Sequence, residues 1–172
     1  IAIRLQKGDF MSWARLAEKN DHIILSTAKG QAIRFKESDV RPMGRTASGV
    51  RAVKLKKGDT LIGADVIASK EASASLFVIS EKGFGKKTNV KSYRLQRRGG
   101  TGIKTAKITA KTGSLVSAKV TDPSLEEIIA VSKKGQVIRT PLSGIPELGR
   151  QTQGVRIMKL ESSDSIASIV CL

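Results

Sequence analysis

Basic side chains recur in this sequence at fixed distances from a glycine. Arg45, Arg98 and Arg150 each stand four residues before a glycine, at positions 49, 102 and 154. Lysine and arginine bind phosphate oxygens, and such contacts fix the path of a nucleic acid without reading its sequence. We therefore predict a repeated DNA-binding element that also includes the cations after each glycine: Arg51, Lys104 and Arg156 two residues later, then Lys54, Lys107 and Lys159.

The middle copy of this pattern is a glycine-rich loop, Q-R-R-G-G-T-G, at residues 96–102. Adjacent glycines permit positive φ and let backbone N–H groups approach an anion closely, while the two arginines add charge and donors. A loop of this composition is a weak signal alone, and its place within a repeat strengthens it. The predicted DNA-binding residues also include Gln96, Arg97, Gly99, Gly100, Thr101 and Gly102 from this loop, Arg34, Lys87 and Arg139 from a strand upstream of each loop, and Arg41.

The charge balance favours a polyanionic partner. The chain has 31 Lys and Arg against 15 Asp and Glu, a net charge of +16, which is more than solubility requires. A solvated basic surface is the simpler alternative, and an anionic membrane is less favoured because no amphipathic basic helix is visible. Only 3% of residues are aromatic. Proteins that bind single strands stack bases on aromatic rings, so we expect duplex DNA held by its phosphates.

The elements that must position these cations are short strands in three repeats. Three segments align without gaps: HIILSTAKGQAIRF (22–35), SLFVISEKGFGKKT (75–88) and EIIAVSKKGQVIRT (127–140). Ile, Val, Leu and Thr dominate each unit, Lys-Gly pairs mark the turns, and no long apolar stripe of helical period is present. The pattern predicts an all-β protein of four-stranded, blade-like repeats. We expect one domain over 1–172, with the end of a preceding blade at 1–16 and repeats at about 17–68, 69–121 and 122–172.

Three blades are too few to close a ring, so we expect a partial ring or an open arc. Equivalent residues on successive blades would then form a curved stripe of charge that a bent duplex can follow. Bending costs about 1–6 kcal/mol for each 20–30 base pairs turned through 40–90°. Arg51 and Lys54 are three apart, so a regular strand would place them on opposite faces. A bulge could expose both; otherwise Lys54, Lys107 and Lys159 only cover an outer face.

The sequence offers little for catalysis or metal binding. It has one histidine, one cysteine and one tyrosine: His22, expected at a strand edge, Cys171, expected to be a buried thiol, and Tyr93, expected to anchor a loop or contact a phosphate. The ligand count excludes a zinc site, the carboxylates form no recurring pair for magnesium, and no P-loop is present. No stretch is apolar enough for a membrane span, and the first residues do not form a signal peptide. We therefore expect no catalytic residue and no metal.

The glycine-rich loop resembles the gyrase A box, QRRGGKG, with Thr101 in place of the family's lysine. The flanking segments DVRPMGRTASGVRAVKL (39–55) and LGRQTQGVRIMKL (148–160) resemble later blades of the same family, the C-terminal domain of the DNA gyrase A subunit. The resemblance covers essentially the whole chain. It implies a six-bladed β-pinwheel whose blades exchange strands, of which this chain would hold the last three. The box at 96–102 would then be a variant copy in the fifth blade.

The resemblance also implies a function. The domain would wrap duplex DNA for negative supercoiling, with the cleaving tyrosine, ATP and Mg²⁺ acting elsewhere in the holoenzyme and no cofactor in this chain. Its partners would be double-stranded DNA, the gyrase B subunit and the rest of the gyrase A subunit, in an A2B2 assembly. The expected location is the bacterial cytoplasm, at the nucleoid. Two alternatives remain: the equivalent domain of the topoisomerase IV A subunit, and a propeller-type module that binds an acidic protein.

Overall fold

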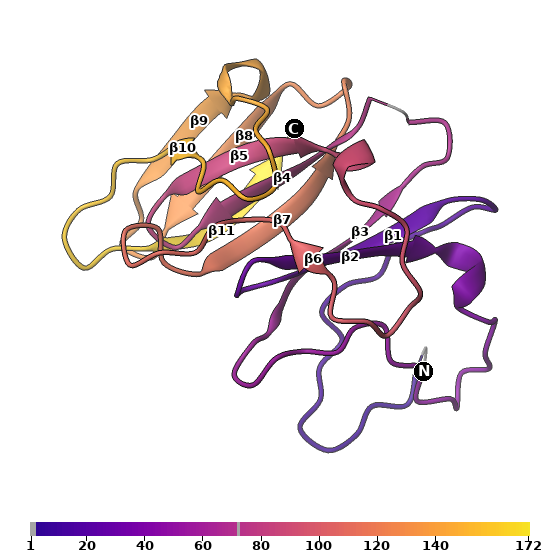
Figure 1. The fold of residues 1–172 in the computed structure, drawn as a ribbon. Coiled ribbons are helices and arrows are strands. Elements are labelled where there is room, and N and C mark those ends of the chain that lie inside the picture. The colour runs from indigo at the N-terminus through magenta and orange to yellow at the C-terminus, as the bar shows by residue number, and fades with distance from the viewer. Residues whose placement is uncertain (1–2, 72) are drawn as a thin grey trace.

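The computed structural model describes residues 3–71 and 73–172, and this part of the chain is built from strands (Figure 1). It contains eleven strands and three one-turn 3₁₀ helices, with no α-helix among the described residues. The expected all-β fold is confirmed. The strands are β1 (His22–Thr27), β2 (Gln31–Lys36), β3 (Leu61–Ile67), β4 (Ser75–Ser80), β5 (Phe84–Asn89), β6 (Ile103–Lys104), β7 (Leu115–Thr121), β8 (Glu127–Ser132), β9 (Val137–Pro141), β10 (Val155–Arg156) and β11 (Ile166–Cys171), and the 3₁₀ helices are η1 (Glu37–Asp39), η2 (Val90–Ser92) and η3 (Leu142–Gly144).

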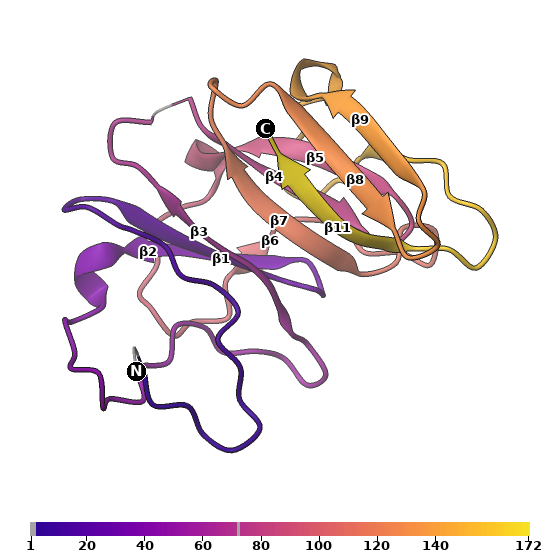
Figure 2. The same cartoon turned by 180° about the vertical axis from the view of Figure 1, so that it is seen from behind.

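The strands form three antiparallel sheets, one for each repeat. Their strand orders are β3-β1-β2-β6, β10-β5-β4-β7 and β11-β8-β9. Each sheet is built on a hairpin, in which β1 pairs with β2, β4 with β5, and β8 with β9. Seen from behind, β7 lies between β3 and β11, so the strand that ends each repeat packs beside its counterpart in the next (Figure 2).

The hairpin turns explain why Lys-Gly pairs recur. Gly30 has φ +77°, a left-handed conformation that glycine adopts without steric cost. The lysine before it, Lys29, donates from Nζ to the backbone carbonyl of Lys57, at 2.6 Å. The same bond recurs from Lys82 to Ala110, at 2.6 Å, and from Lys134 to Ser162, at 2.9 Å. These lysines therefore tie each hairpin turn to the segment that leads into the last strand of its own repeat.

Neighbouring repeats exchange a strand. β6 comes from the second repeat but pairs with β2 of the first, and β10 comes from the third repeat but pairs with β5 of the second. The glycine before each donated strand permits this approach. A Cβ on Gly102 would lie 2.5 Å from the Ala32 carbonyl oxygen, and a Cβ on Gly154 would lie 2.5 Å from that of Gly85. The second glycine of each repeat is therefore required where a donated strand meets its acceptor.

The two ends of the array lack this exchange. The third sheet has three strands, not the four expected of each blade, because no further segment of the described residues pairs with β9. Val137 on its open edge is 60% exposed, and a Cβ on Gly135 would have open space around it. At the other end, residues 49–55 occupy the donor position of the first repeat but form no strand. The described chain thus has an unused donor segment at one end and an unused acceptor edge at the other.

The buried cores join the repeats. One apolar cluster combines Ile24 and Ile67 of the first repeat with Leu76 and Tyr93 of the second. A second cluster combines residues of the second repeat, such as Phe77, with residues of the third. A third cluster, around Phe35, lies within the first repeat. Because the other two clusters each draw on two repeats, we expect the repeats to stabilise one another rather than fold separately.

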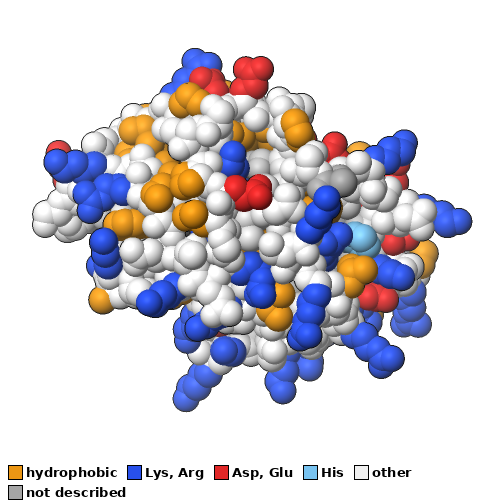
Figure 3. Space-filling view, turned by 45° about the horizontal axis from the view of Figure 1, so that its top comes forward, with side chains coloured by type: hydrophobic (Ala, Val, Ile, Leu, Met, Phe, Trp, Pro, Cys, Tyr) orange, Lys and Arg blue, Asp and Glu red, His pale blue; other side chains and the backbone are white. Residues whose placement is uncertain are grey.

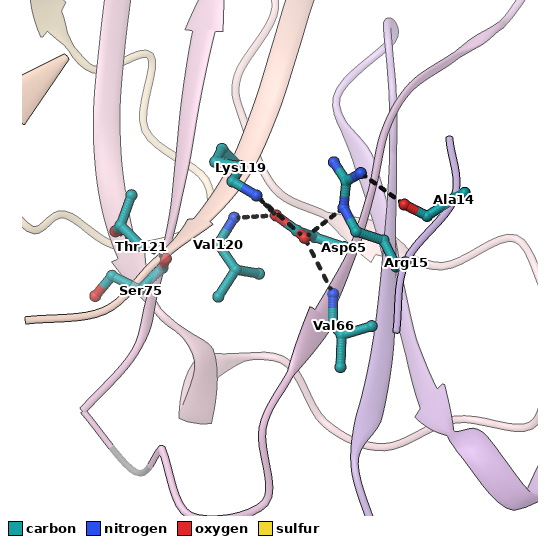
Figure 4. A network of polar contacts seen from close by, with 8 residues as sticks. All are labelled: Ala14, Arg15, Asp65, Val66, Ser75, Lys119, Val120 and Thr121. Carbon is teal, nitrogen blue, oxygen red and sulfur yellow. Dashed lines mark hydrogen bonds and ion pairs between the residues drawn. The ribbon is translucent and has the colours of Figure 1, made fainter. Parts of the chain in front are cut away.

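A buried carboxylate adds a polar link between the first two repeats (Figure 4). Asp65 on β3 accepts the backbone N–H of Val120 at 2.9 Å, on the neighbouring strand β7. Its oxygens also lie 3.0 Å from Arg15 Nε and 3.0 Å from Lys119 Nζ. A buried carboxylate is costly unless it is paired and hydrogen-bonded, and here it has both kinds of partner. Asp65 therefore fixes the N-terminal segment and β7 against β3.

Candidate nucleic-acid interface

Three equivalent loops carry the predicted arginines, and each precedes the donor segment of its repeat. We call them loop 1 (43–49), loop 2 (96–102) and loop 3 (148–154). Loop 2 lies along β2 of the first repeat, where the Gln96 N–H donates to the Arg34 carbonyl at 2.9 Å. Loop 3 lies along β5 in the same way, with the Leu148 N–H donating to the Lys87 carbonyl at 2.8 Å. Each of these two loops is therefore held by the sheet of the preceding repeat.

The loop arginines have partly structural roles. Arg98 donates from Nε to the Asp39 carbonyl at 3.0 Å and from Nη1 to the Arg51 carbonyl. Arg150 donates from Nη1 to the Lys104 carbonyl at 2.8 Å. Arg51 and Lys104 are equivalent residues, so each arginine ties its loop to the donor segment of the preceding repeat. Both arginines are partly exposed, which leaves other guanidinium N–H groups free to face a phosphate. Arg45, in loop 1, is exposed.

The cations that follow each loop are directed to solvent. The two donated strands end at Lys104 and at Arg156, so strand alternation does not extend to the lysine three residues later. The two side chains of each repeat can therefore both face solvent, and the expected placement on opposite faces of a strand does not apply. All six side chains are exposed: Arg51, Lys104, Arg156, Lys54, Lys107 and Lys159. At equivalent positions, each of the three repeats thus exposes an arginine or lysine and, three residues later, a lysine.

The second-strand cations are more enclosed. Arg34 donates from Nη1 to the Val90 carbonyl at 2.9 Å and to the Tyr93 carbonyl at 3.2 Å, both in the next repeat. Lys87 makes the equivalent bond to the Leu142 carbonyl at 2.7 Å. Burial lowers the pKa of Arg34 below its ordinary value. The geometry gives Arg34 and Lys87 a role in binding the next repeat, which the sequence pattern did not indicate.

The remaining predicted residues divide by exposure. Arg139 on β9 is exposed and pairs with Glu127 of its own hairpin. Arg97, Thr101 and Arg41 are exposed, whereas Gln96, Gly99, Gly100 and Gly102 are partly buried. The structure therefore places the exposed members of loop 2 at its arginine and threonine positions, while its glycines lie against the preceding repeat.

Loop 3 borders a hollow of ≈ 540 Å³ that is rich in cations. Arg94, Lys104 and Arg150 line it, together with neutral residues and no acidic side chain among those described. A concave site lined by one sign of charge concentrates its field and attracts counter-ions.

Figure 3 shows Lys and Arg side chains along the lower edge of one face, while acidic side chains are more scattered. This distribution suits a phosphate backbone better than a compact neutral ligand.

The side chains considered for catalysis have structural surroundings. His22 Nδ1 lies 2.9 Å from Arg34 Nη2, and burial, followed by the charges of Arg34 and Lys36, lowers its pKa. Tyr93 is buried, and its hydroxyl lies 2.5 Å from Thr105 Oγ1; burial raises its pKa. Cys171 is partly buried, and burial likewise raises the pKa of its thiol. In this chain Tyr93 belongs to the apolar core shared by the first two repeats.

Residues 3–71 and 73–172 contain no metal-binding cluster and no candidate membrane-spanning helix. Among these residues, no group of three or more His, Cys, Asp and Glu side chains could hold a metal ion. The same part of the chain includes no helix with the length and apolar character needed to cross a membrane.

The sequence pattern did not indicate one buried basic residue that lies beneath the candidate interface. Lys86 lies on β5 beneath loop 3 and is 0% exposed. Its neighbour Lys87 attracted attention because a cation recurs there in all three repeats. The available signal was different: Ile33 and Ile138 occupy the positions equivalent to Lys86, so a lysine stands where two repeats have a buried or half-buried apolar residue.

Comparison with known families matches three separate segments of this chain. A family model described as "DNA gyrase C-terminal domain, beta-propeller" matches residues 21–68, 74–122 and 126–172. The DNA gyrase A subunit of Staphylococcus epidermidis is 41% identical over 169 residues, which cover 98% of this chain. That of Aminobacterium colombiense is 39% identical over 164 residues, which cover 95% of this chain. The chain spans about a fifth of the length of these curated relatives, 19% and 20% respectively.

Solved structures give the same architecture. A structure of a DNA gyrase A C-terminal domain aligns with a TM-score of 0.85 and 33% identity, covering 99% of this chain and 57% of that one. A topoisomerase IV C-terminal domain aligns with a TM-score of 0.81 at 24% identity, covering 90% of this chain and 47% of that one. At that identity the second match supports the fold alone.

Proposed function

Because the chain belongs to the DNA gyrase C-terminal domain family, we propose that it binds and bends duplex DNA along the edge formed by its loops and donor segments. The observation that carries this proposal is the recurrence of exposed cations after each loop. Arg51, Lys104 and Arg156 are equivalent, and each is followed at the same distance by an exposed lysine. A duplex that contacts all three places must follow the curvature of the array.

The proposed contacts are to phosphates, because the recurring side chains are lysine and arginine and the loops present backbone N–H groups and glycines. Phosphate contacts supply affinity that depends on salt but carry little sequence information. The proposed binding is therefore largely independent of sequence. The cationic hollow beside loop 3 would accept a phosphate near Arg94 and Arg150.

We further propose the role that this domain would have in its parent protein. As the non-catalytic C-terminal domain of a gyrase A subunit, it would set the path of DNA in an ATP-dependent type IIA topoisomerase that introduces negative supercoils. The bonds of the DNA backbone would be broken and rejoined elsewhere in an assembly of A and B subunits, where ATP and Mg²⁺ also act. The proposed location is therefore the bacterial cytoplasm, on chromosomal DNA.

A charge-reversal variant tests the proposal. The change R51E/K104E/R156E is expected to lower duplex affinity and to reduce the slope of log affinity against log salt by about 3, or about 1 for each phosphate contact removed. DNA bending, measured by energy transfer between labelled duplex ends, should fall with it. The matched control is K19E/K70E/K133E, which reverses three exposed lysines outside the predicted set.

A competition experiment separates DNA binding from the function of a module that binds an acidic protein. If polyaspartate displaces the wild-type chain from duplex DNA at equal charge concentration, electrostatic attraction alone explains binding. If both triple variants bend DNA as the wild type does, the repeated cations do not form the DNA path and the proposal is wrong.

A further inference from the structure

Lys86 is a buried lysine whose partners are uncharged. Its ammonium donates to the Gly149 carbonyl at 2.5 Å, the Arg150 carbonyl at 2.9 Å and the Thr152 hydroxyl at 3.0 Å. All three acceptors belong to loop 3, and a lysine ammonium has three N–H donors. One side chain of the second repeat thus uses all of its donors on a loop of the third repeat.

The equivalent place in the first sheet is filled differently. Ile33 is 0% exposed there, and its Cδ1 would lie 3.6 Å from a Cβ on Gly100 of loop 2. Thr152 is the loop 3 residue equivalent to Gly100. The two positions therefore differ together: an apolar side chain lies under a glycine in one case, and an amine lies under a hydroxyl in the other. This correlated difference indicates that the bonds of Lys86 are a specific feature of loop 3.

We propose that Lys86 is a positioning residue, and that its three hydrogen bonds hold loop 3, with Arg150, in the geometry that contacts DNA. This inference rests on the proposed function. Loop 3 carries Arg150, and the hollow that Arg150 lines would lose its shape if the loop moved away from β5. The third repeat would then contribute less to the path of the duplex.

Loss of the proton would change one of the three bonds without releasing the loop, because the burial and the Arg150 charge that lower the pKa of Lys86 both require loop 3 to lie in place. A neutral amine keeps two N–H donors and gains a lone pair, so one of the three oxygens would face a lone pair instead of a donor. Burial, and then the charge of Arg150, lowers the pKa of Lys86 from 10.5 to about 8. The change would therefore occur in a mildly alkaline range, well below that of an exposed lysine.

The groups around Lys86 do not obscure this transition. On β4 the residue paired with it is Val78, which does not titrate. From loop 3 the facing charge is Arg150, which stays protonated. Tyr93 also senses Arg150, but burial raises its pKa, so it stays neutral as Lys86 loses its proton. Binding of a phosphate beside Arg150 should in turn favour the protonated amine, since coupling between two binding events is reciprocal.

Nuclear magnetic resonance of the 172-residue chain tests the attachment without DNA. The Lys86 side chain should titrate near pH 8, and the backbone amides of residues 149–152 should shift with the same midpoint, while those of residues 99–101 in loop 2 should not. Lys86→Ile, which installs the residue found in the other two repeats, should abolish the loop 3 transition. Lys91→Met, which removes an exposed lysine, should leave it unchanged.

A second measurement connects the attachment to DNA. Between pH 7 and pH 9 the wild-type chain should lose about threefold in duplex affinity beyond the loss seen in Lys86→Ile, the share of roughly one phosphate contact. Loop 3 amides that do not follow the Lys86 titration, or that keep the same shifts in Lys86→Ile, would overturn the inference. If no variant binds DNA at any pH, the proposed function fails, while the resonance titration still decides whether Lys86 positions the loop.

Discussion

Two junctions between neighbouring repeats share one backbone arrangement and differ in what fills it. At the first junction loop 2 meets β2, and at the second loop 3 meets β5. In both, a backbone N–H of the preceding donor segment bonds to the loop: the Lys54 N–H donates to the Gly100 carbonyl at 2.9 Å, and the Lys107 N–H to the Thr152 carbonyl at 3.0 Å. The comparison shows that backbone hydrogen bonds set the register, while the residue on the second strand decides how the loop is retained.

The largest effect should come from the glycines that both junctions need. Gly154→Val would place a Cβ 2.5 Å from the Gly85 carbonyl oxygen at a residue with φ +84°. We expect a loss of about 3–5 kcal/mol in unfolding free energy, from backbone strain and overpacking together. Chemical denaturation measures it. Gly49→Val is the control, because its φ is also +84° but its nearest contact is Ile3 Cδ1 at 3.8 Å; an equal loss there would show that strain alone is responsible.

A transplant of the second junction into the first should have the next largest effect. Ile33→Lys buries an amine beneath Gly100, where no hydroxyl is available, and we expect it to cost about 2–4 kcal/mol of unfolding free energy. Adding Gly100→Thr supplies the missing acceptor and should recover about 1 kcal/mol. A double-mutant cycle by urea denaturation gives the coupling energy. Strictly additive losses would mean that the transplanted lysine and threonine do not interact as Lys86 and Thr152 do.

The pH dependence of the unfolding free energy should distinguish the two junctions by a smaller amount. The unfolded chain keeps the Lys86 proton to about pH 10.5, while the folded chain releases it near 8, so the unfolded state binds more protons between these values. The unfolding free energy of the wild type should therefore rise with pH in this window relative to Lys86→Ile, by about 1–3 kcal/mol. Denaturation curves at pH 7, 9 and 10 check the sign. A falling difference would show that the buried ammonium is not disfavoured in the folded state.

The smallest effect should come from the arginines that tie each loop to the preceding donor segment. Arg98 donates to two carbonyls and Arg150 to one. Arg98→Met should cost about 1–2 kcal/mol and Arg150→Met about 1 kcal/mol or less, because both side chains are partly exposed. Thermal unfolding of the two variants ranks them. The opposite order would indicate that loop 3 depends on its arginine more than we infer, despite its attachment by Lys86.

The fold was accessible from the sequence because its repeats are long and locally consistent. Alternating apolar residues, Lys-Gly turns and a fixed glycine spacing together predict strands and hairpins, and they make the all-β assignment secure. The donor positions of β6 and β10 are marked by Gly102 and Gly154. Their partners are not marked, because pairing between repeats depends on non-local contacts that a linear pattern does not contain.

The site was predictable only in part, for a related reason. The side chains of Lys104, Lys107 and their equivalents are exposed because the donated strands are only two residues long. A strand of two residues is too short for its period to be read from the sequence. Arg34 and Lys87 recur for a structural reason, since each binds a carbonyl of the next repeat, and recurrence alone does not separate such a role from phosphate contact. Lys86 was overlooked because it occurs once. A search for repeats emphasises what the copies share, whereas this residue is informative because it departs from them.

The exchange of strands has a consequence for how such an array can be lengthened, shortened or cut. The first complete sheet needs residues from His22 in β1 to Lys104 in β6, a span well beyond one repeat. No single repeat therefore encodes a closed unit, and a segment excised at the repeat boundaries would take its last sheet without a fourth strand. Damage to one repeat should accordingly appear as a defect in the sheet before it, on the N-terminal side of the altered residues.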